Sequence, residues 1–388
     1  MLFRGSMFVL LSVTLWAGLC VGCTAENRSP EPMPEASVQE NSTPTPAPDA
    51  DPARRPSRVA LFGDRPDQEK VPFENRLITN LCQHSFTIEG LDFDPDIFSA
   101  ENVLVFASTR NAERPDVYLK RTDGTTLTQL TSDPADDIQP RFSPDGERVV
   151  FCSNRGGNWD IWSVRRHGTE LTQLTNDPAD EVAPSWSPDG STVAYTVWGR
   201  RSHQWEIWTL SLEHPGARRF LAYGMFPAWS PDGKRIAFQR SRERGSRLFS
   251  VWTLDLEDGE ARRPTEIAHN DAAACIAPAW SPDGSMIVYC TVQRETHEAE
   301  TDAKTPRHAD LWVVELNSGL RVKLTDGSGA AFNPVWASDG RIFFVSPRSG
   351  TENIWSLAAT VGQYPDDRSQ ATRVSQAKTN VSVVSEED

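Results

Sequence analysis

A short turn sequence recurs along the chain and constrains its fold more than any other feature. Ser-Pro-Asp-Gly occurs four times, at residues 143–146, 187–190, 230–233 and 281–284. We interpret Phe93-Asp94-Pro95-Asp96 and Ala337-Ser338-Asp339-Gly340 as weaker copies, which makes six units spaced 43 to 56 residues apart. In such a turn proline fixes φ, aspartate bonds the local backbone and glycine accepts a left-handed conformation. A repeat of this length predicts one architecture built from equivalent units.

Each unit contains the pattern of four short strands. An aromatic residue precedes the turn, and alternating apolar residues such as Val149 and Phe151 follow it. A third strand is centred on an aliphatic-aromatic pair such as Ile161-Trp162, and a fourth has the pattern Leu-Thr-Gln-Leu-Thr at 127–131 and 171–175. A sheet with two apolar faces buries both by stacking on neighbours around an axis. The repeat therefore predicts an all-β, six-bladed β-propeller of four-stranded antiparallel blades over residues 76–376, with the recurring Trp residues in its core.

The two ends of such a ring have to meet, because an unclosed last blade would expose a sheet edge. Residues 76–81 (RLITNL) resemble the fourth-strand pattern, so we expect this N-terminal segment to complete the sixth blade. The competing segment is 371–375 (ATRVS). Residues 377–388 are mostly polar, and we expect a disordered tail there.

The first 22 residues have the pattern of a signal peptide. Arg4 precedes sixteen mostly apolar residues, 7–22, and this stretch is shorter than the roughly 20 residues of a membrane-spanning helix. Its end, Leu19-Cys20-Val21-Gly22-Cys23, resembles a bacterial lipobox. The resemblance implies cleavage after Gly22, lipid attachment at Cys23 and, because Thr24 is not Asp, anchoring in an outer membrane facing the periplasm or the cell surface. A plain secreted protein is the alternative.

Residues 23–75 are predicted to be a lipid-anchored, disordered linker. The part from 24 to 57 contains eight prolines and almost no apolar residues. Such a segment buries too little apolar surface to offset the entropy of ordering, so it stays extended and tethers the domain that follows.

The repeats resemble a known family, the TolB-like six-bladed propellers, whose blades carry a Pro-Asp-Gly variant of the WD-type repeat. The resemblance covers about residues 76–357 and implies a role in binding at the bacterial cell envelope. In TolB an α/β domain precedes the propeller, whereas this chain has the Pro-rich linker in that place.

Composition and motifs favour binding over catalysis. The chain has 39 Lys+Arg against 54 Asp+Glu and a formal net charge of −15, which excludes a general nucleic-acid binder. The sequence contains no G-x-S-x-G, H-E-x-x-H or P-loop motif, and its seven His residues fall in separate units. We therefore predict no catalytic residue, metal site or cofactor, and expect a non-enzymatic, monomeric scaffold that binds an envelope protein or peptide segment through one rim. The alternative is a propeller enzyme, a lyase or glycoside hydrolase acting on an envelope or extracellular glycan.

The predicted binding rim is the side where the loops between second and third strands meet the connections between blades. Acidic residues gather there at Asp136, Asp137, Asp180 and Glu181, either to face a partner or to bond local backbone amides. Neighbouring loops are basic and aromatic, a composition typical of interface anchors that would suit an acidic segment or an anionic glycan, although a solvated loop is the alternative. The residues of this second set are Trp198, Arg200, Arg201, Trp205, Arg242 and Arg244.

Cys275 and Cys290 flank one of the predicted turns. A two-residue loop would place them opposite each other, whereas a three-residue loop with a bulge would direct their sulfurs to opposite faces. The sequence leaves both a disulfide and two free thiols open.

Overall fold

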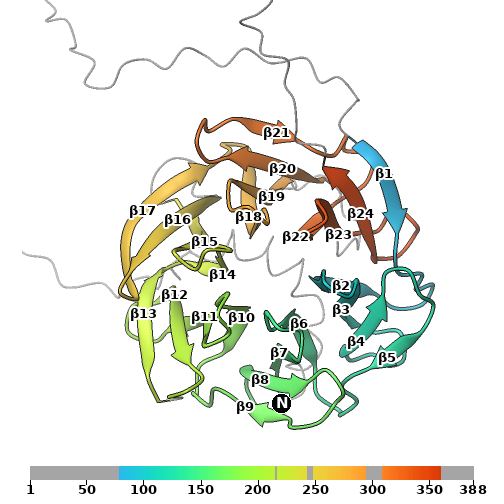
Figure 1. Cartoon of the computed structure of the whole chain (residues 1–388), viewed down its shortest axis with the longest axis horizontal. Coiled ribbons are helices and arrows are strands. Elements are labelled where there is room, and N and C mark those ends of the chain that lie inside the picture. The colour runs from blue at the N-terminus through green and yellow to red at the C-terminus, as the bar shows by residue number, and fades with distance from the viewer. Residues whose placement is uncertain (1–77, 215, 243–247, 294–307, 360–388) are drawn as a thin grey trace, which may run out of the picture. The chain divides into compact units, whose positions relative to one another are not determined.

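The structure is a computed structural model that describes residues 78–214, 216–242, 248–293 and 308–359. The described residues form 24 strands and no helix. The strands make six four-stranded antiparallel sheets that stand like blades around a central axis (Figure 1). The predicted all-β six-bladed propeller is confirmed. The segments predicted as signal peptide, linker, competing strand and tail lie outside the described residues.

Three blades follow one another along the first half of the described chain. Blade 1 consists of β2 (Asp92–Phe98), β3 (Val103–Ser108), β4 (Asp116–Arg121) and β5 (Leu127–Gln129). Blade 2 consists of β6 (Asp137–Phe142), β7 (Arg148–Ser153), β8 (Asp160–Arg165) and β9 (Thr172–Gln173). Blade 3 consists of β10 (Glu181–Trp186), β11 (Thr192–Gly199), β12 (Gln204–Ser211) and β13 (Arg218–Tyr223).

The remaining blades repeat this order until the ring closes. Blade 4 consists of β14 (Met225–Trp229), β15 (Arg235–Ser241), β16 (Phe249–Glu257) and β17 (Glu260–Ala268). Blade 5 consists of β18 (Ala273–Trp280), β19 (Met286–Gln293), β20 (Ala309–Glu315) and β21 (Arg321–Lys323). Blade 6 consists of β22 (Phe332–Trp336), β23 (Arg341–Ser346), β24 (Asn353–Ala359) and β1 (Ile78–Gln83).

The four Ser-Pro-Asp-Gly turns join the first and second strands of blades 2 to 5 by the same hydrogen bonds. In blade 2, Asp145 accepts from the Ser143 hydroxyl and the Glu147 amide, and the Ser143 oxygen accepts from the Arg148 amide. Gly146 has a φ of 72°, a conformation that glycine adopts without strain. The turn thus fixes where each first strand ends.

The weaker copy at Ala337 to Gly340 also forms a turn. The turn predicted at residues 93–96 is wrong, because these residues lie within a strand. Pro95 lies inside strand β2, and the turn of blade 1 is formed by residues 99–102. The strand Asp92–Phe98 continues through Pro95 because this proline lies at a bulge in the strand and does not form a turn.

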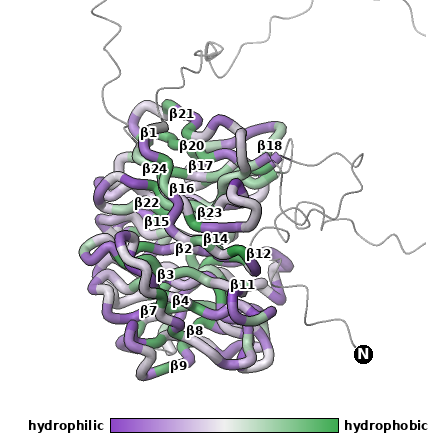
Figure 2. The backbone as a smooth tube through the Cα atoms, turned by 90° about the vertical axis from the view of Figure 1, so that its right-hand side faces the viewer, coloured by the Kyte–Doolittle hydropathy of each residue, from purple (hydrophilic) through white to green (hydrophobic). Residues whose placement is uncertain are grey.

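The core lies between the blades, where the face of each sheet packs on the next. Ile207 of blade 3, for example, shares a fully buried cluster with Ile236 and Phe238 of blade 4. All nine recurring Trp residues belong to such clusters or pack against them, as the sequence predicts. Figure 2 shows hydrophobic segments along the strands and hydrophilic loops at the margins.

The N-terminal strand closes the ring, as predicted. Strand β1 pairs antiparallel with β24, with Cys82 opposite Ser356, and the first and last coloured strands lie side by side in Figure 1. The chain beyond β1 is then held by Asn353, which is 1% exposed. Its amide oxygen accepts from the Thr87 amide (2.8 Å) and the Ser85 hydroxyl (3.1 Å), and its nitrogen donates to the Thr87 carbonyl (3.1 Å).

Cys275 and Cys290 are free thiols on opposite faces of blade 5. Cys275 stands opposite Thr291, and Cys290 stands opposite Ile276. The loop holds four residues between Ser281 and Met286, and a bulge between Ile276 and Ala279 shifts the register again. The two sulfurs therefore enter different core clusters, and no disulfide joins them.

No helix in the described part of the chain could serve as a membrane-spanning segment.

Replacing Asn353 with Ala should destabilise the closed ring by about 2–4 kcal/mol, because several buried hydrogen bonds are lost together. The measurement is urea unfolding followed by Trp fluorescence. The matched control is the exposed Asn176→Ala, for which we expect a change below about 0.5 kcal/mol. Equal stabilities of the two variants would contradict the assigned role of Asn353.

Candidate ligand-binding site at the hub

The innermost strand of every blade carries a bulge at a proline. The strand register shifts at this point in all six blades. The residue before each proline has a positive φ of 50° to 54°, although none of the six is glycine. These six residues are Asp94, Gln139, Ala183, Phe226, Ala277 and Asn333.

Side chains of neighbouring blades hold three of these strained positions in place. The amide of Ala183 donates to the Gln139 side chain (2.7 Å), and the amide of Ala277 donates to Gln239 (3.0 Å). The amide of Phe226 donates to the Thr196 hydroxyl (3.0 Å). A positive φ in a residue other than glycine costs free energy, and it persists where surrounding contacts enforce it. The bulges turn six short segments toward the axis.

These segments line a pocket of about 390 Å³ at the hub. Residues of the first strand of every blade contribute to its wall, and Pro188, Pro231 and Pro282 place it on the side of the Ser-Pro-Asp-Gly turns. Most of the wall consists of Pro, Ala, Ser and the inner edges of Trp residues. A concave site of this size, whose wall combines apolar and polar groups, is typical of ligand binding.

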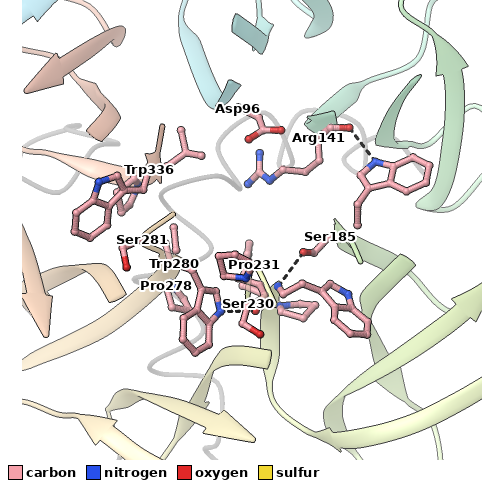
Figure 3. Close-up of a pocket in the computed structure, with 18 of the residues that line it drawn as sticks. Asp96, Arg141, Ser185, Ser230, Pro231, Pro278, Trp280, Ser281 and Trp336 are labelled. Atoms are coloured by element: carbon pink, nitrogen blue, oxygen red, sulfur yellow. Dashed lines mark hydrogen bonds between the residues drawn. The ribbon is translucent and has the colours of Figure 1, made fainter. Parts of the chain in front are cut away.

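Charge in the pocket comes from two blades. The charged residues that line it are Asp94 and Asp96 of β2 and Arg141 of β6. Figure 3 shows the Arg141 side chain directed into the pocket with Asp96 beside it. In the other blades the residue after the proline is small or apolar: Ser185, Ala228, Ala279 and Val335. The hub is therefore polar on one side and weakly polar on the other.

Asp94, one of the residues lining this pocket, has a buried hydrogen-bond acceptor without a partner among the described residues. Its side chain accepts from the Asn333 amide nitrogen at 2.8 Å, but its second carboxyl oxygen has no partner among the described residues. The residue is 3% exposed. Burial raises its pKa to about 6, against the opposing charge of Arg141. Burial therefore favours the protonated form of this carboxyl more than it does in an exposed aspartate.

Arg141 and Asp96 complete the polar side. Arg141 donates from Nη1 to the carbonyl oxygens of Pro140 (2.8 Å) and Pro95 (3.4 Å), and it forms no ion pair within the described residues. Asp96 accepts from the Phe142 amide at 2.8 Å, and burial raises its pKa. The remaining nitrogens of Arg141 are available to a carboxylate, carbonyl or hydroxyl of a ligand.

The acidic residues predicted for the rim are part of the framework. Asp137 is 0% exposed and pairs with Arg155 at 2.8 Å. Glu181 is 1% exposed, lies 3.3 Å from Arg218, and has its pKa raised to about 7 by burial. Asp136 accepts from Asn154 at 2.8 Å, and Asp180 accepts from the Trp159 amide at 3.1 Å. Of the four, only Asp180 accepts from a backbone amide, which is the alternative that the sequence left open, whereas the other three bond to side chains of residues further along the chain.

The predicted basic and aromatic set divides in two. Trp198 and Trp205 meet edge to face, 5.2 Å apart, at the β11–β12 hairpin, with Trp198 39% exposed. Arg200 and Arg201 are exposed on the same hairpin, and Arg200 donates to the Pro178 carbonyl. Arg242, in contrast, pairs with Glu266 and Asp271 at 3.1 Å each. Arg244 lies outside the described residues.

The sequence patterns did not identify Asp94, Asp96 and Arg141 as site residues, although the recurring proline beside them was a usable signal. The proline two or three residues before the end of each first strand recurs in all six units, at 95, 140, 184, 227, 278 and 334. Because Pro95 was aligned with the prolines of the Ser-Pro-Asp-Gly turns, the recurring proline of the first strands was not recognised as a separate feature. In the described part of the chain, no cluster of three or more His, Cys, Asp and Glu side chains could hold a metal ion.

Comparisons with known proteins agree with the fold. Residues 159–384 match the family described as the tricorn protease N-terminal beta propeller domain, and residues 73–221 match the TolB beta propeller domain. A TolB homolog of Chlorobium luteolum is 34% identical over 94 residues, which are 24% of this chain and 20% of that protein. The chain spans about a fifth of the length of the curated relatives it matches.

Solved structures support the same architecture. A TolB-type protein from Agrobacterium tumefaciens is 19% identical with a TM-score of 0.53, and the match covers 71% of this chain and 96% of that one. A gluconolactonase from Xanthomonas campestris is 14% identical with a TM-score of 0.52, and the match covers 73% of this chain and 90% of that one. At these identities the likeness concerns the fold alone.

The raised pKa of Asp94 predicts a specific pH dependence of stability. Below about pH 4 the carboxyl is protonated in both folded and unfolded chains, whereas between pH 4 and 6 only the unfolded chain loses the proton, so stability falls as pH rises. Asp94→Asn removes this loss. Its free energy of unfolding relative to the unchanged protein should therefore rise by about 2–3 kcal/mol between pH 4 and 7.

Urea unfolding at several pH values measures this difference. Asp258→Asn, in an exposed turn, is the matched control and should show a flat difference. A flat profile for Asp94→Asn as well would show that the buried carboxyl is not the titrating group.

Proposed function

The chain belongs to the family of the tricorn protease N-terminal β-propeller domain and is a TolB-like propeller, and on this premise we propose that it is a non-enzymatic binding module of the bacterial cell envelope. Its partner is an envelope protein that inserts a peptide segment into the hub pocket. The TolB homolog among its relatives supports the envelope location.

The observation that carries this proposal is the one-sided polarity of the hub. Arg141 offers guanidinium donors, Asp94 offers an unpaired acceptor, and both line a pocket whose other walls are Pro, Ala and Ser. A peptide backbone supplies carbonyl acceptors and amide donors together, so one extended segment can satisfy both groups at once. Because the bulges hold the wall in a fixed shape, binding requires little reordering of the protein.

The β11–β12 hairpin is the competing surface. Its Trp198, Arg200 and Arg201 are exposed, as expected of interface anchors. It lies at the opposite end of the strands from the Ser-Pro-Asp-Gly turns, so one bound segment at the hub mouth does not also require it. We assign the primary site to the pocket because it is concave and combines the donors of Arg141 with the unpaired acceptor of Asp94.

A second candidate function is catalysis in the same pocket. The pKa of Asp94, about 6, suits a general acid or base, and Arg141 beside it suits a carboxylated sugar. This combination favours the lyase or glycoside hydrolase alternative. The variants Arg141→Gln and Asp94→Asn, described next, distinguish peptide binding from catalysis.

A photo-cross-linking residue in place of Ser338, an exposed residue of the pocket wall, tests the binding site in envelopes of the source bacterium. We expect one dominant cross-linked envelope protein, and its yield should fall roughly tenfold when Arg141→Gln is added, because a charge-assisted hydrogen bond is lost. The matched control is a cross-linker at Arg201 on the hairpin. Cross-linked products from position 201, with none from the pocket position, would contradict the pocket and assign the binding site to the rim.

An activity assay on uronic-acid oligosaccharides addresses catalysis. The binding function predicts no turnover by the unchanged protein or by Asp94→Asn. Turnover that Asp94→Asn abolishes would establish the enzyme and overturn the non-enzymatic proposal.

We propose that the domain is attached to the outer membrane by a lipid on Cys23. Cys23→Ser should move the protein from the membrane fraction to the soluble fraction, because the acyl chains supply the membrane affinity. Fractionation and intact mass of the mature protein are the measurements. A mature N-terminus at a residue other than Cys23, or membrane retention of the Ser variant, would contradict the lipid anchor.

A further inference from the structure

Three blades share one arrangement of Ser and Arg at the end of the second strand. The sequences are Ser108-Thr109-Arg110, Ser153-Asn154-Arg155 and Ser346-Pro347-Arg348. In each, the arginine Nε donates to the serine hydroxyl, at 3.1, 2.8 and 3.0 Å. Each guanidinium also lies over two aromatic rings of its own blade, 5.0 to 5.5 Å from their centroids. Stacking and the hydrogen bond fix all three guanidinium groups in the same place.

In blades 1 and 2 a buried aspartate completes this arrangement. Arg110 reaches Asp92 at 2.6 Å, and Arg155 reaches Asp137 at 2.8 Å. Both aspartate side chains are 0% exposed. Each aspartate stands two residues before the positive-φ residue of its first strand. The carboxylate thus belongs to the repeat as much as the arginine does.

Blade 6 lacks the carboxylate. The residue two positions before Asn333, the positive-φ residue of β22, is Ala331, and it is 0% exposed. Arg348 forms no ion pair with any described residue. Ser346, whose counterpart Ser108 donates to Asp92, donates instead to the Ala330 carbonyl at 2.6 Å. The guanidinium is held in position without its counter-ion.

The surroundings of Arg348 leave this cation half-buried and open to a ligand. Burial lowers the pKa of Arg348, and the charge of Asp326 only partly opposes this effect. A partly desolvated guanidinium that forms no direct ion pair gains strongly when a carboxylate arrives. Gly329 lies beside Arg348, where a Cβ atom would stand 3.3 Å from the Arg348 Cβ and 3.8 Å from its Nε, so this neighbour places no side chain over the arginine.

We propose that Arg348 is a binding site for one carboxylate group of an external ligand, which takes the role that Asp92 and Asp137 have in blades 1 and 2. The ligand is an acidic side chain or terminal carboxylate of a peptide, or a small carboxylic acid, since these share the group that the site recognises. The site lies at the end of the second strand, away from the turn side on which the hub pocket lies, and goes beyond the proposed function.

The test uses the Nε–H signals of arginines in isotope-labelled protein, with sodium acetate added at constant ionic strength against sodium chloride. The Arg348 signal, assigned by its loss in Arg348→Gln, should shift and saturate, whereas the signal of Arg155 should not move. A shift that grows linearly, or that chloride reproduces, would overturn the proposal.

Ala331→Asp supplies the missing carboxylate from within the chain. This variant should weaken the acetate response of Arg348 roughly tenfold or more, because an internal ion pair then competes for the same nitrogens. Ala331→Ser is the matched control and should keep the response. An unchanged response in Ala331→Asp, with the fold verified by circular dichroism, would overturn the proposal. If Ala331→Asp does not fold, Arg348→Gln decides, because a saturable effect of acetate on neighbouring amides that persists without the guanidinium would overturn the proposal.

Titrations of the same labelled protein with an acidic peptide and with phosphate distinguish a polypeptide ligand from a small carboxylic acid. The peptide acetyl-Gly-Asp-Gly-Asp-Gly-amide should saturate Arg348 at lower concentration than acetate if the ligand is a polypeptide, and at a similar concentration if it is a small acid. Phosphate saturating the signal well below acetate would contradict recognition of a carboxylate.

Discussion

Face-to-face burial of blades is the constraint on which this structure depends. No single four-stranded sheet here covers its own apolar faces, so each is stable only between two neighbours. A ring meets that condition for every blade, provided that its ends are joined. Strand β1 joins them by pairing with β24, and Asn353 fastens the segment that follows. Closure therefore fixes the position of strand β1.

The repeat builds the frame, and departures from it create the chemistry. Six bulges of equal geometry surround the hub, yet charge enters at Asp94, Asp96 and Arg141 alone. The Ser and Arg arrangement of blades 1, 2 and 6 follows the same logic, because Ala331 removes the acid from one copy. When a repeat positions the same charged pair in several blades, the loss of one partner in one blade leaves the other partner unpaired at a defined position. Such positions are where a ligand can bind without disturbing the fold.

Sequence patterns located the blades well and the site poorly. The turn column and the Trp columns are local signals, so they identified five of the six turns, the strands beside them and the closing segment, which the structure describes as β1. Asp137 and Glu181 illustrate the difficulty with the site. As sequence they are acidic loop residues suited to a partner, but their Arg partners lie 18 and 37 residues further along the chain. Burial by distant residues cannot be seen in a window of local sequence.

What the sequence alone determined is the period of the repeat, the type of its strands and the need for a closed ring, because all three follow from local turn chemistry and alternating hydrophobicity. Only the tertiary structure decided which residues face the axis, since a bulge at each proline reorients the strand and, in three blades, side chains of the blade before it hold that bulge. The free state of Cys275 and Cys290, the exposure of Arg141 to the hub and the unpaired state of Arg348 all depend on that register. Each is a relation between segments that are distant in sequence and adjacent in space.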